Sequence, residues 1–87
     1  MIDNKEKQRF EDSENGKLVF ADYRIRDGHY ALVHVEADPE LRGTGAAPRL
    51  MEAIVAHARA NNLKLQPRCS YAVTWFKRHP EAADLKA

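Results

Sequence analysis

The sequence predicts a mixed α/β (α+β) fold in which an antiparallel β-meander is followed by a helix, a strand and a second helix. Two observations carry this prediction. In the first half, Asn15-Gly16 and Asp27-Gly28, which are typical two-residue hairpin turns, separate runs rich in β-branched and aromatic residues. In the second half, apolar residues recur every three or four positions, which is the period of an amphipathic helix.

Three strands are expected in the meander, at residues 8–14, 18–26 and 29–37. The third is almost wholly apolar and is therefore expected in the middle of the sheet. Residues 1–7 are mostly polar or charged and are expected to form a loose terminus. The strand at 8–14, whose alternation is weak, would then lie at the sheet edge.

A helix of about four turns is expected to follow and to end at Asn61-Asn62, because asparagine tolerates the left-handed conformation. A short strand at 63–67 and a second helix at 70–79 come next, with Ser70 as N-cap and Pro80 as stop signal. The apolar face of the first helix consists of Ala47, Leu50, Met51, Ile54, Val55 and Ala58.

A strand, a crossover helix and another strand usually form a right-handed parallel unit. The strands at 29–37 and 63–67 are therefore expected side by side, with the helices packed against the sheet. A chain of 87 residues is expected to form one domain, 1–87.

Composition excludes several classes of function. The formal net charge is +1, with 14 basic and 13 acidic side chains, which argues against a nucleic-acid-binding protein. No apolar run approaches ~18 residues, and the charged N-terminus lacks the apolar segment of a secretory signal. A single cysteine, Cys69, cannot form an internal disulfide. These features together predict a reduced, cytoplasmic protein with no membrane partner.

The stretch 39–50, "PELRGTGAAPRL", places Gly43 and Gly45 between a strand and a helix. Such a loop is either a tight turn or an anion site, where backbone N–H groups and the helix dipole meet a phosphate. It lacks the lysine of a Walker A loop and the third glycine of a dinucleotide fingerprint. A nucleoside triphosphate or NAD is therefore a poor fit.

"LRGTGAA" resembles the acetyl-CoA loop of the GNAT superfamily of N-acetyltransferases, Q/R-x-x-G-x-G/A, although Glu40 stands where Gln or Arg is usual. The likeness covers about residues 9–85, over which the sequence is similar to the small stand-alone YjdJ-type subfamily. Shared features are a His-x-Glu strand, a Pro-Glu-x-Arg-Gly-x-Gly loop, a Pro-x-Cys step and an Arg-His-Pro-Glu ending. The resemblance implies a compact GNAT-like fold and an acetyl-CoA-dependent N-acetyltransferase.

The resemblance also implies which residues meet the cofactor. Pro48 stands where the subfamily often has serine; proline suits a first helical turn but removes one N–H donor. Arg49 either adds charge near the cofactor or is merely solvated. The backbone amides expected to hold the CoA pyrophosphate are those of Arg42, Gly43, Thr44, Gly45, Ala46 and Ala47.

Two catalytic candidates lie on the strand at 29–37. Alternate residues of a strand share a face, so Tyr30, Leu32, His34 and Glu36 are expected on one face. In GNAT enzymes the equivalent strand lies beside the thioester, and a backbone N–H of it would polarise the carbonyl. Glu36 is the first choice as general base, and is otherwise an exposed carboxylate. His34 can exchange a proton near neutral pH, and is otherwise a structural residue.

Cys69 is the third candidate, because a thiol at a helix start beside Arg68 favours the thiolate. It would act as acid for the departing CoA, as an acyl-carrying nucleophile, or only in packing. Tyr71 is an alternative acid. The acceptor would be an amine on a small molecule or a protein, and no metal site is expected. The alternatives are a non-catalytic CoA-binding module, used as a sensor or partner protein, and a scaffold whose loop binds nothing.

Overall fold

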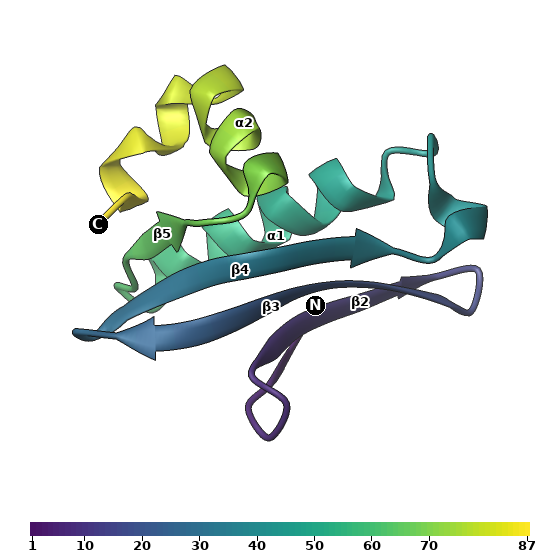
Figure 1. The fold of residues 1–87 in the computed structure, drawn as a ribbon, viewed down its shortest axis with the longest axis horizontal. Coiled ribbons are helices and arrows are strands. Elements are labelled where there is room, and N and C mark those ends of the chain that lie inside the picture. Colours follow the sequence, from purple (N-terminus) through teal and green to yellow (C-terminus); the bar gives the residue numbers. More distant parts are fainter.

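The computed structural model describes residues 1–87 and contains one five-stranded sheet (Figure 1). The first four strands are antiparallel, whereas the last strand runs parallel to its neighbour. The predicted meander and the predicted parallel pairing are both confirmed. In spatial order the strands are β1 (Ile2–Asn4), β2 (Arg9–Glu14), β3 (Lys17–Arg26), β4 (His29–Ala37) and β5 (Leu65–Pro67).

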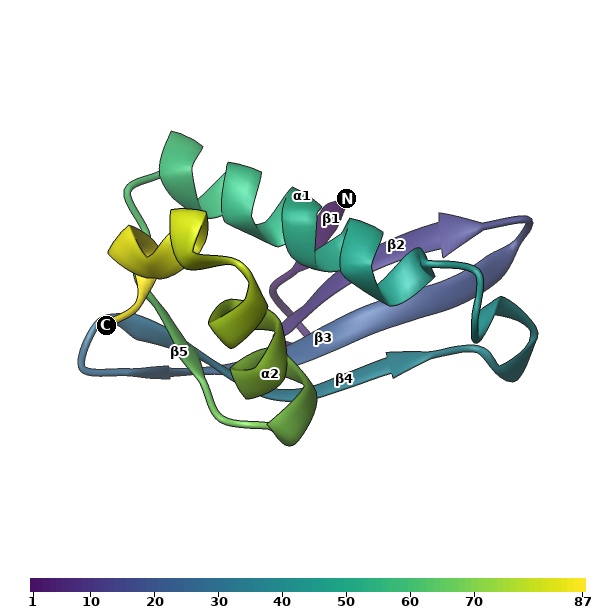
Figure 2. The ribbon, with the colours of Figure 1, turned by 90° about the horizontal axis from the view of Figure 1, so that it is seen from above.

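Both helices lie on the same face of the sheet, and the opposite face, which we call the open face, carries no helix (Figures 1 and 2). A cluster of 17 buried residues fills the space between helices and sheet. None of the helices is long and apolar enough to cross a membrane. The helical segments are η1 (Pro39–Leu41), α1 (Ala46–Ala60), α2 (Ser70–Arg78) and η2 (Pro80–Leu85).

The N-terminal residues are ordered rather than loose. Ile2–Asn4 form β1, which pairs with β2 and makes it an internal strand instead of the expected edge. The reason is a tertiary contact, because the buried Tyr23 hydroxyl donates a 2.6 Å hydrogen bond to Asp3 Oδ1. Burial, and then this bond to Asp3, raise the pKa of Tyr23 above its ordinary value. The local sequence pattern carries no sign of such a contact.

A β-bulge interrupts β4 in the middle. Leu32 pairs with Tyr23 of β3, whereas His34 pairs with Asp22, the residue next to Tyr23, so that Val33 is left without a partner. A bulge of this kind inserts one residue in one strand only. Because side chains alternate with a period of two, the extra residue reverses the faces of everything beyond it.

The bulge overturns the expected alignment of four side chains on one face. Tyr30 and Leu32 face the helices and pack in or against the core. His34 and Glu36 project instead from the open face, where both are exposed. Strict alternation would have placed these two side chains under α1.

The second helix begins one residue away from the expected cap. Cys69 is the N-cap of α2, with its Sγ accepting the N–H of Ala72 at 3.4 Å. Ser70, predicted as the cap, is the first helical residue. Pro80 follows the helix as expected and opens the 3₁₀ turns of η2.

Candidate functional site

The loop between β4 and α1 depends on two glycines in the left-handed region. Gly43 has φ +79° and Gly45, the N-cap of α1, has φ +87°. A Cβ on Gly43 would meet no atom of the chain within 4 Å. The space around Gly43 is therefore open, and backbone groups there are accessible to a ligand.

Backbone N–H groups gather at this loop without partners. Of the six amides predicted to hold pyrophosphate, two are used inside the loop: Arg42 N bonds Pro39 O at 3.3 Å, and Thr44 N bonds Leu41 O at 3.2 Å. The unpartnered donors belong to Gly43, Gly45, Ala46 and Ala47. Four free N–H groups at a helix N-terminus provide the donors and the positive dipole end that an anion requires.

These amides border a groove between the loop and α2. One hollow of about 360 Å³ lies against Gly43, Gly45 and Ala46, and a second of about 460 Å³ runs along α2 to Arg78. Pro48 and Tyr71 line both hollows, so we treat the two as one loop groove. Its volume lies in the range of ligand sites.

The far part of the loop groove lies along α2 and is lined mainly by polar residues of that helix. Ser70, Thr74 and Arg78 line it together with the buried Trp75, and the three polar residues recur every four positions along α2. That spacing is the signal that would have identified them as one face of a helix.

Arg49 lies over the N-cap glycine. Its Nε and one terminal nitrogen donate to both carboxylate oxygens of Glu14, at 2.9 and 2.6 Å. A Cβ added to Gly45 would come within 2.9 Å of the other terminal nitrogen of Arg49. The hydrogen bond from Arg49 lowers the pKa of Glu14, so the carboxylate stays charged and balances the guanidinium.

The sheet opens beside the bulge. The last residue of β5, Pro67, pairs with Leu32, and the N–H groups of Arg68 and Cys69 both donate to Leu32 O, at 3.0 and 3.2 Å. Beyond this point, residues 34–37 of β4 have a strand partner only on the β3 side, and the bulged Val33 has none. The free edge of β4 therefore begins at the bulge and runs toward the glycine loop.

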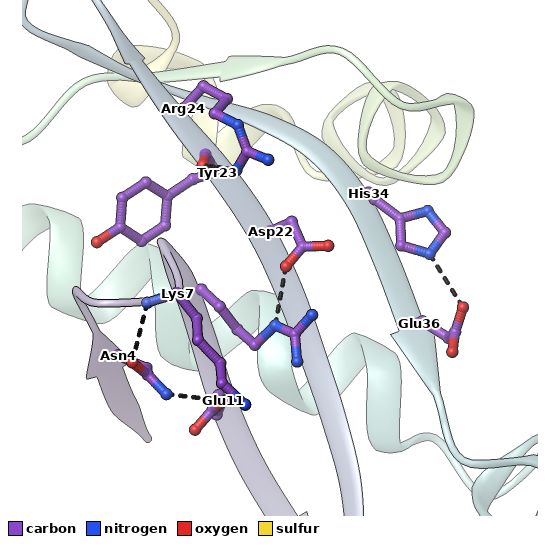
Figure 3. A network of polar contacts seen from close by, with 9 residues as sticks. Asn4, Lys7, Glu11, Asp22, Tyr23, Arg24, His34 and Glu36 are labelled. Atoms are coloured by element: carbon purple, nitrogen blue, oxygen red, sulfur yellow. Dashed lines mark hydrogen bonds and ion pairs between the residues drawn. The ribbon is translucent and has the colours of Figure 1, made fainter.

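His34 and Glu36 form a pair on the open face (Figure 3). His34 Nε2 lies 3.0 Å from Glu36 Oε1, and each side chain is 52% exposed. A carboxylate can only accept, so in neutral His34 the bonded Nε2 carries the hydrogen and Nδ1 keeps a free lone pair. Sequence reasoning named these two residues as separate candidates, and the structure joins them.

Cys69 and Tyr71 occupy different positions at the start of α2. Cys69 is half-buried against the core, its Sγ caps the helix, and it lines neither hollow of the loop groove. Tyr71 lines both hollows. Burial, and then the nearby Cys69, raise the pKa of Tyr71, so its hydroxyl keeps its proton at neutral pH.

Comparison with known proteins identifies the family and a similar fold. The family model described as GCN5-related N-acetyl-transferase matches residues 9–85, and the chain belongs to this family. A similar solved structure is the NMR solution structure of a GCN5-like candidate N-acetyltransferase from Staphylococcus aureus. The two chains are 31% identical with a TM-score of 0.71, over 92% of this chain and 81% of the other. A search of curated protein sequences found no match.

Proposed function

We propose that the chain binds acetyl-CoA in the loop groove and transfers the acetyl group to an amine. The observation that carries the proposal is the set of four unpartnered N–H groups around Gly43 and Gly45, at the positive end of α1. Membership of the GCN5-related family supports it. The more specific likeness to the YjdJ-type subfamily is part of the same proposal and depends on the shared His34-x-Glu36 strand and loop motif.

The residues present fit this cofactor. The free amides of Gly43, Gly45, Ala46 and Ala47 would hold the pyrophosphate, and the groove continues along α2 to Arg78, whose charge no carboxylate balances. Bound acetyl-CoA would supply an acetyl group as a thioester, and transfer exchanges its C–S bond for a C–N bond to the amine. The ammonium nitrogen loses two protons in all: the general base takes one, and the other balances the proton that the departing sulfur gains.

We assign removal of the ammonium proton to the pair on the open face. Nδ1 of His34 has the free lone pair, and the hydrogen bond from Nε2 to Glu36 fixes the orientation of the ring. Glu36 is the alternative base, acting directly or through a water. Both residues lie on the part of β4 that borders the free edge, within the stretch 33–37.

The remaining roles belong to the free edge and to α2. A backbone N–H of residues 33–37, on the side without a strand partner, would polarise the acetyl carbonyl. Two side chains are candidates for the proton that the sulfur receives. Tyr71 lines the groove and keeps its proton at neutral pH, and Cys69 lies two residues before it.

The experiment that tests the proposal is an acetyl-CoA titration of ¹⁵N-labelled protein with a matched pair of variants. Gly43 and Gly28 have nearly the same φ, +79° and +78°, and a Cβ on either meets nothing within 4 Å. Alanine should therefore cost both positions the same, about 1–2 kcal/mol for a Cβ in the left-handed conformation. Only Gly43→Ala should weaken acetyl-CoA binding. Absence of shifts at residues 43–47 under saturating acetyl-CoA, or equal affinity of the two variants, would refute the cofactor assignment.

A CoA-binding module without catalysis is the second candidate. It is favoured by the position of His34 and Glu36, which are exposed on the face opposite the helices that form the loop groove. Release of free CoA thiol in the presence of an amine panel distinguishes the two functions. Binding without thiol release for any amine would favour the module.

A further inference from the structure

A second concave site lies on the open face, next to the place where β4 and β5 separate. We call it the open-face hollow; its volume is about 500 Å³ and it is lined by Arg26, Asp27, Ala31, Val33, Gln66 and Arg68. Ala31 and Gln66 are register partners on neighbouring strands. The small side chain of Ala31, which is only 2% exposed, forms the floor of the hollow.

The hollow carries positive charge that the chain does not balance. Arg9, Arg49 and Arg59 are each held in an ion pair with a carboxylate. No carboxylate pairs with Arg26 or Arg68, and Asp27 is the only acidic residue in the lining. Arg24, the β3 register partner of Ala31, is also without an ion pair and donates only to Tyr23 O. Figure 3 shows Arg24 on β3, beside the strand that carries His34.

Gln66 adds a group that the fold leaves unsatisfied. Its Oε1 is buried and has no hydrogen-bond partner in the chain. A buried polar atom without a partner is unfavourable, by about 1–3 kcal/mol. The amide is thus not locked by internal bonds, and it can turn to meet a polar ligand in the hollow.

Two residues that line the hollow lie close to the proposed catalytic pair, His34 and Glu36. Arg68 lines the hollow, and its backbone N–H donates to Leu32 O at the point where β4 and the segment after β5 separate. Val33 lines it as well, and this bulged residue immediately precedes His34. A ligand held in the hollow therefore lies along β4 on the same face as the His34–Glu36 pair.

We propose that the open-face hollow binds the carboxylate end of the acetyl acceptor, so that the acceptor is a small amine that also carries a carboxylate. Arg68 and Arg26 hold the carboxylate, since the guanidinium fork matches its two oxygens. The amino group then points along β4 toward His34 and the free strand edge. The identity of the bound group as an acceptor depends on the proposed acetyl transfer, whereas binding of the carboxylate does not.

The test is a titration of ¹⁵N-labelled protein without acetyl-CoA. The probes are ω-amino acids from glycine to 6-aminohexanoate, each paired with the n-alkylamine of equal chain length. At least one amino acid should shift the Val33 and Arg68 amides and the Gln66 side-chain amide saturably, while its alkylamine should not. If no amino acid shifts these signals more than its alkylamine does, the proposal is overturned.

Variants locate the binding. Arg68→Gln and, independently, Arg26→Gln should weaken binding of the best amino acid by about tenfold or more, as expected for loss of a charged hydrogen-bond donor. Arg59→Gln is the matched control, because it removes the same charge at a hollow formed by α1 and the C-terminal segment. If Arg68→Gln, Arg26→Gln and Arg59→Gln all bind the amino acid with the same affinity, the proposal is overturned. Acetyl-CoA binding is monitored separately, through the amides of residues 43–47. Failure of the cofactor assignment can therefore be distinguished from failure of the open-face hollow to bind a carboxylate.

Discussion

Arg49, in the first turn of α1, donates two hydrogen bonds of 2.9 and 2.6 Å to Glu14 at the end of β2, and its guanidinium lies beside Gly45. The contact joins the N-terminal end of α1 to a residue 35 positions earlier in the chain. Because Glu14 balances its charge, Arg49 contributes less positive potential to the loop than an unpaired arginine would.

Removing that carboxylate charge should strengthen acetyl-CoA binding. In Glu14→Gln the guanidinium of Arg49 is unbalanced beside the free amides of Gly43 and Gly45, so the affinity should rise a few-fold at low salt and the gain should shrink as salt is added. Isothermal titration at two salt concentrations measures this. Arg49→Gln in the same background should cancel the gain. An affinity that stays the same in Glu14→Gln at low salt would show that Arg49 does not act on the ligand.

Pro48 offers a second adjustment of the same groove. Pro48 is the third residue of α1 and lines both hollows. The first N–H of the helix that bonds back to an earlier carbonyl is that of Arg49, to Gly45 O at 3.1 Å. An N–H at position 48 would therefore have no partner within the chain and would be available to a ligand. Pro48→Ser should tighten CoA binding, by at most roughly 1.5–3 kcal/mol for one bond to a charged group. Pro48→Ala restores the N–H without the hydroxyl and so separates the two donors. Unchanged affinity in both variants would mean that this N–H does not face the ligand.

The fold was largely predictable because its signals are local. Asn15-Gly16 and Asp27-Gly28 specify the hairpins, and the apolar period of residues 47–58 specifies α1, whose position between two strands implies the parallel pair. The glycine loop could be predicted as well, because left-handed turns select glycine. The unpredicted features depend on tertiary contacts.

The bulge at Val33 shows this limit most clearly. Nothing in "HYALVHVEA" marks one valine as the extra residue, since any of several apolar residues fits a strand. The register follows from packing of Leu32 toward the helices on one side of the bulge and of Val35 on the other. The anchoring of β1 by Tyr23 and Asp3 is another example, and it joins residues 20 positions apart.

The position of His34 and Glu36 beyond the bulge leads to a kinetic prediction. His34→Ala should lower kcat by about a hundredfold or more, as expected for a lost general base. Glu36→Gln should cost less, because the amide oxygen can still accept from Nε2 and keep the ring in place. Acetyl-CoA affinity should be unchanged in both variants, since neither residue lines the loop groove. Full activity in both would make the pair a surface contact; a larger loss in Glu36→Gln would identify Glu36 as the base.

The start of α2 permits a test of which group protonates the departing sulfur. Tyr71 lines the groove whereas Cys69 is occupied as the helix cap, so Tyr71→Phe should lower kcat about ten- to a hundredfold with little change in CoA affinity. Cys69→Ser should keep near-normal activity, because serine is itself a good N-cap. Cys69→Ala should lose roughly 1 kcal/mol of stability with the cap.

The pH dependence gives an independent check on Tyr71. A proton donor fails as the pH rises through its pKa, and burial raises the pKa of Tyr71 above its ordinary value of 10.0. Loss of this proton should therefore not reduce the rate anywhere below about pH 10. The opposite pattern, with full activity in Tyr71→Phe, a large loss in Cys69→Ser and protection of the thiol from alkylation by CoA, would transfer the role to Cys69.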